Sequence, residues 1–156
     1  MAAEIGRPAP PFTLPGTDST EAGRRDHSLD EHRGHVVVLV FYPGDNTPVC
    51  TRQLNAYTDD IGAFQDAGAE VLAISPQSVD SHEEFSCKQE GFGFPLLADT
   101  DKEVGAAYGI LGPLGFYRRS VFVIDAEGIV RYAHRAVAGL TFRPTRELLA
   151  AVRAAS

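Results

Sequence analysis

The residues of this chain best suited to chemistry are its two cysteines, Cys50 and Cys87. Cys50 follows a turn-forming run at 43–46 and stands three residues after Thr47 and two after Pro48. Threonine suits the N-cap of a helix and proline suits its first position, so these residues predict a helix with Cys50 at its third position. The free backbone N–H groups and partial positive charge of a helix start favour the thiolate, the nucleophilic form of cysteine. The spacing therefore indicates a nucleophilic cysteine at a helix N-terminus.

Three side chains near Cys50 each allow a functional and a structural interpretation. The Thr47 hydroxyl lies on the same side of the first helical turn and can donate to the sulfur or to a bound oxygen, or it can simply cap the helix. Pro43 can shield the site from water or only end a strand. Gln53 can orient the loop or face solvent, and both cysteines can be buried, inert thiols. These alternatives stay open from the residues alone.

A strand, a helix and a second strand must position Cys50. Residues 35–42 are continuously apolar and β-branched, which is typical of a strand buried on both faces. A helix from Pro48 to Gly68 is predicted by apolar residues at three- and four-residue steps, namely Leu54, Tyr57, Ile61 and Phe64. Residues 70–75 predict a second buried strand. Such a strand–helix–strand unit places its two strands parallel in one sheet.

The remaining segments predict further elements around this unit. Residues 7–15 are rich in proline and extended, and a short strand is expected at 27–29. Residues 76–90 are expected to form a helix with Ser81 and Glu84 as its capping box. The other expected elements are an extended piece at 94–99, a helix at 102–108, a loop at 109–115, a hairpin of 120–124 with 129–134, and a helix at 144–155. The sum is an α/β fold, a central mixed β-sheet flanked by helices on both faces.

Size, charge and composition exclude several classes of function. A length of 156 residues fits a single domain, residues 1–156. The formal net charge of −7 argues against binding to nucleic acid and to an anionic membrane. No apolar run is long enough to span a membrane and the N-terminus lacks a secretory pattern, so we expect a cytoplasmic protein. Two cysteines and scattered histidines make no metal site, and no nucleotide-binding loop is present, so we expect no metal and no cofactor.

Pro43, Thr47 and Cys50 match the Pro-x-x-x-Thr-x-x-Cys signature of the peroxiredoxins. The longer segment 41–53 resembles most closely the bacterioferritin-comigratory-protein branch of that family. The resemblance covers nearly the whole chain and includes the proline-rich segment 8–12, the segment 94–99 and the strand 119–125. It implies a thioredoxin-like fold and a thiol-dependent peroxidase that reduces hydrogen peroxide and organic hydroperoxides.

The resemblance implies a role for each matched residue. Cys50 attacks the peroxide and becomes a sulfenic acid, Thr47 hydrogen-bonds the sulfur and the peroxide, and Pro43 shields the site. Arg119 matches the family's arginine, which stabilises the thiolate and polarises the peroxide. Arg118 is the competing candidate, but side chains alternate along a strand, so only one of the two can face Cys50. We expect Arg119, from its offset to the apolar strand that follows, and the reaction needs no metal, flavin or nicotinamide.

The second cysteine has two interpretations within this family. Some members of the branch carry the resolving cysteine five residues after the first, where this chain has Asn55. Others carry it on the following helix, and Cys87 fits that variant. The intramolecular disulfide then requires an external reductant, a thioredoxin-like protein, and the branch implies a monomer or a weak dimer. If Cys87 is a bystander, an external thiol resolves the sulfenic acid instead.

Three other functions remain as alternatives. A thiol–disulfide oxidoreductase normally has Cys-x-x-Cys, but here Thr47 and Gln53 hold the partner positions. A redox sensor would use Cys50 and Cys87 as a switch with little turnover, and turnover with thioredoxin separates it from a peroxidase. A structural domain with inert thiols predicts no reaction of Cys50 with peroxide.

Overall fold

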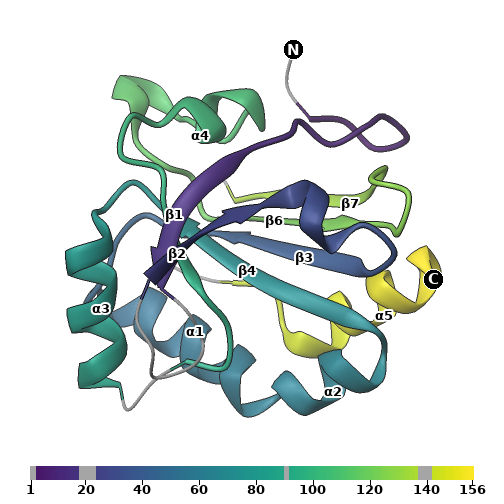
Figure 1. The fold of residues 1–156 in the computed structure, drawn as a ribbon, viewed down its shortest axis with the longest axis horizontal. Coiled ribbons are helices and arrows are strands. Elements are labelled where there is room, and N and C mark those ends of the chain that lie inside the picture. The colour runs from purple at the N-terminus through teal and green to yellow at the C-terminus, as the bar shows by residue number, and fades with distance from the viewer. Residues whose placement is uncertain (1–2, 18–23, 90–91, 137–141) are drawn as a thin grey trace.

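A computed structural model describes residues 3–17, 24–89, 92–136 and 142–156. In this part of the chain, seven strands form one mixed sheet in the order β2-β1-β5-β4-β3-β6-β7 (Figure 1). The strands are β1 (Thr13–Thr17), β2 (Arg24–Ser28), β3 (Val36–Phe41), β4 (Ala69–Ser75), β5 (Leu96–Ala98), β6 (Ser120–Ile124) and β7 (Val130–Arg135). The helices are α1 (Pro48–Asp59), α2 (Ile61–Asp66), α3 (Val79–Lys88), α4 (Glu103–Ala107) and α5 (Thr145–Ala155), with 3-10 turns at Leu29–His32 and Pro113–Gly115.

The centre of the sheet is built from β3, β4 and β6. β3 and β4 run parallel with Val38 opposite Val71, and β6 runs antiparallel to β3 with Ser120 opposite Phe41. All six residues of β3 are buried, as expected for a strand that is covered on both faces. The predicted strand–helix–strand unit is therefore confirmed, and so is the hairpin of β6 with β7.

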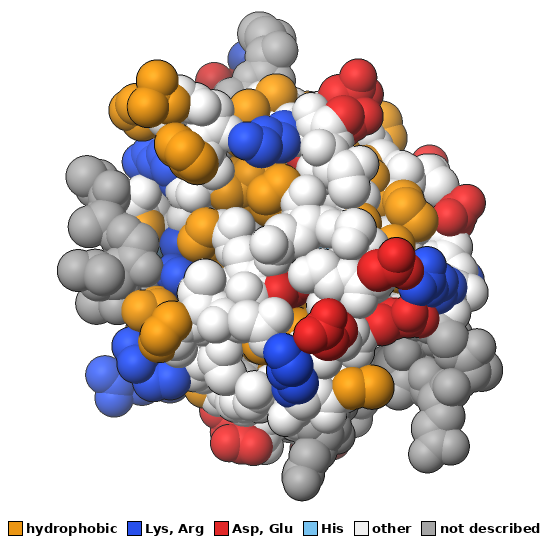
Figure 2. All heavy atoms as spheres, turned by 90° about the vertical axis from the view of Figure 1, so that its left-hand side faces the viewer, with side chains coloured by type: hydrophobic (Ala, Val, Ile, Leu, Met, Phe, Trp, Pro, Cys, Tyr) orange, Lys and Arg blue, Asp and Glu red, His pale blue; other side chains and the backbone are white. Residues whose placement is uncertain are grey.

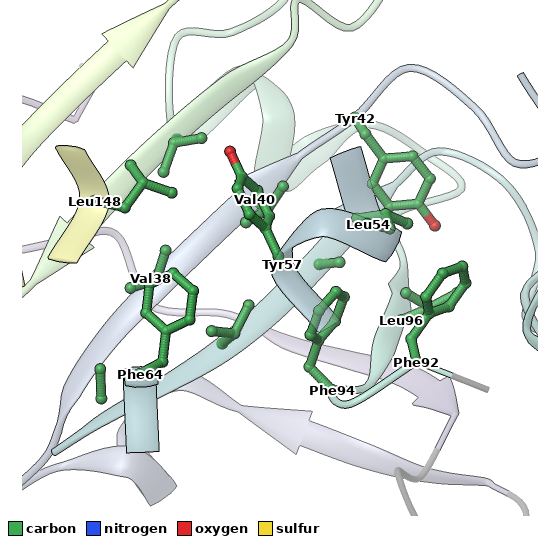
Figure 3. Packing of buried hydrophobic residues seen from close by; sticks show 14 of the residues in the cluster. Val38, Val40, Tyr42, Leu54, Tyr57, Phe64, Phe92, Phe94, Leu96 and Leu148 are labelled. Atoms are coloured by element: carbon green, nitrogen blue, oxygen red, sulfur yellow. The ribbon is translucent and has the colours of Figure 1, made fainter. Parts of the chain in front are cut away.

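Helices cover both faces of the sheet and enclose two apolar cores. In Figure 1, α1, α2 and α5 lie on one side of the sheet and α4 lies on the other. Figure 3 shows the first core, to which Leu54 of α1 and Val38 of β3 belong. The second core lies across the sheet, where the rings of Phe41 and Tyr108 pack with centroids 5.2 Å apart. Cys50 belongs to the first core, so the fold keeps its sulfur away from bulk water.

Two local predictions about the helices are wrong. The single helix expected from Pro48 to Gly68 is divided, because Asp60 leaves the helical conformation between α1 and α2 at φ −101° and ψ 11°. The residues around this break include two aspartates and a glycine, which are types that weaken a helix. α3 begins after Ser78, whose side chain accepts a hydrogen bond from the Ser81 backbone N–H. Ser81 is therefore inside the helix and is not its N-cap.

Candidate active site

Cys50 occupies the third position of α1, just beyond the end of β3. Thr47 is the N-cap, with an extended backbone at φ −84° and ψ 147°, and Pro48 is the first helical residue, as their spacing predicts. The Cys50 side chain is fully buried, with a relative exposure of 0%. Because the first N–H groups of a helix have no partner inside it, the start of α1 offers the sulfur a positive potential.

A buried arginine lies against the Cys50 sulfur. Nη2 of Arg119 is 3.1 Å from Sγ of Cys50, and Arg119 is only 4% exposed. Arg119 directly precedes β6, which pairs with the end of β3 at Phe41, so the strand register carries the guanidinium to the start of α1. Arg118 turns elsewhere, because its Nε donates to the backbone carbonyl of Ala136 at 3.0 Å. A cation and a helix N-terminus, both of which attract negative charge, thus converge on one sulfur.

Gln53, one turn further along α1, holds the arginine from the other side. Gln53 is fully buried, and its Oε1 accepts a hydrogen bond from Nη1 of Arg119 at 2.5 Å. Its Nε2 donates to the Tyr57 hydroxyl at 3.5 Å, and that hydroxyl donates to the Arg143 carbonyl at 2.7 Å. Burial raises the pKa of Tyr57 to about 12, so the phenol remains a donor at neutral pH. Of the two interpretations that the sequence leaves open for Gln53, solvent exposure is therefore wrong.

Pro43 and Thr47 lie on the loop between β3 and α1, and both are exposed. The Thr47 hydroxyl donates to the backbone carbonyl of Gly44 at 3.2 Å, and it makes no side-chain capping bond to α1. The fold therefore brings Thr47 to the helix turn that carries Cys50, but its hydroxyl bonds the loop in this state. Pro43 stands at the surface at the other end of the same loop.

A second polar cluster, which the sequence pattern does not reveal, lies buried beside this loop. Asp45 accepts hydrogen bonds from the hydroxyls of Tyr42 and Ser81, each at 2.7 Å, and its Oδ2 lies 2.7 Å from Nδ1 of His82. The Asp45 backbone N–H donates to the Gln77 side chain. Burial, reinforced by the Asp45 carboxylate, raises the pKa of Tyr42 well above its ordinary value, so its hydroxyl remains a donor. Asp45 and His82 are 37 residues apart, and only the folded chain brings them together.

The structure does not bring Cys87 to Cys50. Cys87 is exposed near the C-terminal end of α3, whereas Cys50 is buried, and both are free thiols. Nδ2 of Asn55 on α1 donates to Oε1 of Gln89 at 3.0 Å, so α1 contacts the chain just after Cys87. The two cysteines therefore lie on segments that touch, one thiol buried and the other exposed.

The part of the chain that the structure describes contains neither a metal-binding cluster nor a membrane-spanning helix. Within residues 3–17, 24–89, 92–136 and 142–156, no three His, Cys, Asp or Glu side chains are grouped to hold a metal ion. No helix among those residues has both the length and the apolar character needed to cross a bilayer. Figure 2, which views the molecule from the left-hand side of Figure 1, shows acidic, basic and apolar side chains intermixed on that face.

Comparison with known proteins assigns the chain to a family. The profile of the AhpC/TSA family matches residues 5–133. The chain belongs to the AhpC/TSA family. It is 36% identical over 142 residues to peroxiredoxin Bcp of Xanthomonas campestris pv. campestris, across 86% of each chain. It is 39% identical over 136 residues to peroxiredoxin-2 of Rattus norvegicus, across 83% of this chain and 68% of the rat protein. The solved mitochondrial 2-Cys peroxiredoxin of Plasmodium falciparum matches with a TM-score of 0.87 and 26% identity, covering 97% of this chain and 93% of that one.

These relatives confirm the main expectations from the sequence. The chain is a peroxiredoxin with the thioredoxin-like fold, an enzyme that uses a thiol to reduce peroxides. Its similarity to Bcp proteins agrees with the bacterioferritin-comigratory-protein branch that the segment around Cys50 resembles. As a member of this family it has a hydroperoxide substrate and a thioredoxin-type reductant.

Proposed function

We propose that residues 1–156 form one peroxidase domain in which Cys50 is the peroxidatic cysteine. The observation that carries this proposal is the buried Cys50 sulfur at the start of α1, with Nη2 of Arg119 3.1 Å away. The attacking species is a thiolate, and the helix start and the guanidinium both place positive charge beside it. The same guanidinium is placed to bind the negative charge that develops on the leaving oxygen.

The first step moves one oxygen atom from the peroxide to the sulfur. The Cys50 thiolate attacks one peroxide oxygen along the O–O bond, so that an S–O bond forms while the O–O bond breaks. The other oxygen leaves as hydroxide or alkoxide and takes a proton to become water or an alcohol. Arg119 stabilises the leaving oxygen, the Thr47 hydroxyl turns from Gly44 to donate to the reacting atoms, and Pro43 limits the access of water. Cys50 is left as a sulfenic acid.

Cys87 is the resolving cysteine in this proposal. Its sulfur attacks the Cys50 sulfenic sulfur, an S–S bond forms, and the hydroxyl leaves as water with the proton of the Cys87 thiol. A disulfide requires Cα atoms within about 7 Å. Because Cys50 is buried in α1 and Cys87 is exposed on α3, the helices must open before the bond can form. A thioredoxin-like dithiol then reduces the disulfide and is itself oxidised to a disulfide.

We also propose the substrates, the cellular compartment and the oligomeric state of the enzyme. Its substrates are hydrogen peroxide and organic hydroperoxides, and it acts in the cytoplasm as a monomer or weak dimer. It has no nucleic-acid or membrane partner and requires no metal or organic cofactor, because the Cys50 sulfur supplies both electrons to the peroxide. The net charge of −7 supports the exclusion of polyanionic partners.

A coupled assay tests this proposal. Peroxide consumption is followed with thioredoxin, thioredoxin reductase and NADPH, and Cys50→Ser is expected to have no turnover. Cys87→Ser is expected to consume about one equivalent of peroxide and then lose thioredoxin-supported turnover, since its sulfenic acid has no internal partner. Turnover by Cys50→Ser at the wild-type rate would contradict the proposal. A wild type that reacts once and is not recycled by thioredoxin would favour a redox sensor.

A further inference from the structure

A buried contact between a carboxyl group and an imidazole ring joins the loop before Cys50 to the helix that carries Cys87. Asp45 lies in the loop between β3 and α1, and His82 lies in the first half of α3. Oδ2 of Asp45 is 2.7 Å from Nδ1 of His82, and both side chains have 0% exposure. A polar contact that is fully buried is costly to break on one side only, because the remaining polar group is left without a partner.

Both ring nitrogens of His82 have a buried oxygen partner. Its Nε2 donates to the backbone carbonyl of Leu97 at 2.9 Å, and its Nδ1 lies 2.7 Å from Oδ2 of Asp45. Asp45 also accepts hydrogen bonds from the hydroxyls of Tyr42 and Ser81. The His82 ring therefore links the loop to both α3 and β5.

The loop held in this way is the one that sets the start of α1. Asp45 is followed by Asn46, which takes the left-handed conformation at φ 63° that asparagine adopts more readily than most other side chains. Thr47, the N-cap of α1, comes next. The contacts of Asp45 with α3 and with Gln77 hold this loop, so α3 helps to fix the turn that positions Cys50.

We propose that Asp45 and His82 are positioning residues that keep the Cys50 loop and α3 closed as one unit, and that this pair must separate before Cys87 can reach Cys50. The proposal rests on the function proposed above, in which Cys87 resolves the sulfenic acid. The closed state presents a buried Cys50 with Arg119 to the peroxide. The open state releases both the loop and α3, so the strength of one contact sets the rate of disulfide formation.

The position of Asp45 and His82 relative to α3 supports this distinction between a closed state that reacts with peroxide and an open state that forms the disulfide. Ser81 and His82 tie the first half of the helix to Asp45, while Cys87 near its end is exposed. Between them Phe85 is fully buried in the first core, and α3 is anchored further by the ion pair of Glu83 with Arg24 at 2.5 Å. Fraying of the last turn alone leaves the contact of Asp45 with His82 in place, because that contact lies in the first half of the helix. Separation of Asp45 from His82 frees both ends of the required disulfide.

The test separates the two half-reactions in rapid-quench mass spectrometry. In His82→Gln, the first-order conversion of the Cys50 sulfenic acid to the disulfide is expected to rise about tenfold or more, because the open state is more populated. The second-order oxidation of Cys50, measured with Cys87→Ser in the same background, is expected to stay within about twofold, since the closed state still dominates. Asp45→Asn is expected to behave alike, and the double variant to show no further increase, because both changes break one contact.

A matched control is Asp125→Asn. Asp125 is also a buried carboxylate in an ion pair, with Nε of Arg131 at 2.7 Å, but it lies at the opposite end of β6 from Arg119. Amide hydrogen exchange of the reduced proteins supplies a second readout, in which His82→Gln is expected to speed exchange in α3 and in the 43–47 loop together. Asp125→Asn is expected to leave both the disulfide rate and the exchange of α3 unchanged.

The outcomes separate this inference from the proposed function. A disulfide that forms at the wild-type rate in His82→Gln, or an equal rise in Asp125→Asn, overturns the positioning role and leaves Cys87 as the resolving residue. If no variant forms a disulfide, Cys87 is not the resolving cysteine. Amide hydrogen exchange then tests whether α3 and the 43–47 loop are coupled. Faster exchange of α3 and the loop in His82→Gln but not in Asp125→Asn supports the coupling of the two segments, and unchanged exchange overturns it.

Discussion

Replacing Arg119 by methionine removes the cation beside Cys50 while keeping an unbranched side chain of similar reach. The change deletes the contact of Nη2 with the Cys50 sulfur at 3.1 Å and leaves Oε1 of the buried Gln53 without its 2.5 Å donor. A hydrogen bond to a charged group contributes about 1.5–3 kcal/mol. If that stabilisation is realised in the transition state, the second-order rate of Cys50 oxidation falls by about 10- to 150-fold.

The assay is the rate of peroxide reduction by the reduced protein in a single turnover, with the neighbouring residue as the control. Arg118→Met removes an arginine whose Nε donates to the Ala136 carbonyl and whose contacts do not include Cys50, so its rate is expected to stay near wild type. Arg119→Lys keeps the charge but cannot contact the sulfur and Gln53 through one planar fork, so an intermediate rate is expected. A rate for Arg119→Met within about twofold of wild type, or an equal loss in Arg118→Met, would show that the Arg119 guanidinium does not assist the oxidation of Cys50.

Three further predictions follow from the surroundings of the site. Thr47→Val removes the hydroxyl that donates to the Gly44 carbonyl, and the oxidation of Cys50 by peroxide is expected to slow by about tenfold. Thr47→Ser keeps a hydroxyl and is expected to stay near the wild-type rate in the same single-turnover assay. Leu54→Ala empties a fully buried position of the first core and is expected to lower the free energy of unfolding in urea by about 2–5 kcal/mol; a smaller loss means that the core closes around the gap. Hydrogen bonds led by Arg143 lower the pKa of Glu147 from 4.5 to about 2, so its carboxylate stabilises the fold above pH 4.5 and loses this effect as the pH falls toward 2. Unfolding across that range should therefore be less pH-dependent in Glu147→Gln than in wild type, and equal slopes would contradict the assignment.

The central elements of the fold are readable from the sequence because their signals are local. β3 is a continuous run of β-branched and apolar residues, and the start of α1 is marked by Thr47 and Pro48 at adjacent positions. Alternation along a strand allows only one of Arg118 and Arg119 to face Cys50, the offset to the following strand favours Arg119, and the structure places Arg119 against Cys50. Each of these inferences uses residues only a few positions apart in the chain.

The features that the sequence does not reveal depend on contacts between distant segments. In the sequence, Asp45 is an ordinary polar residue of a turn. Only the packing of α3 beside the loop shows that Asp45 contacts His82. The role of Gln53 depends on Arg119, which is 66 residues away. Ser81 and Glu84 have the spacing of a capping box, but Ser78 supplies the cap because the packing of α3 sets where the helix begins. Local pattern therefore locates the nucleophile, whereas tertiary contacts decide what holds it.

Intact mass spectrometry after one equivalent of hydrogen peroxide shows directly whether Cys50 is the residue that peroxide oxidises. We expect that the reduced wild type loses two hydrogens, that Cys87→Ser gains one oxygen at Cys50, and that Cys50→Ser is unchanged. The loss of two hydrogens marks the disulfide, and the added oxygen marks the sulfenic acid that precedes it. A wild type whose Cys50 does not react within seconds, or a Cys50→Ser variant that is oxidised as fast as wild type, would contradict the assignment of Cys50 as the peroxidatic cysteine.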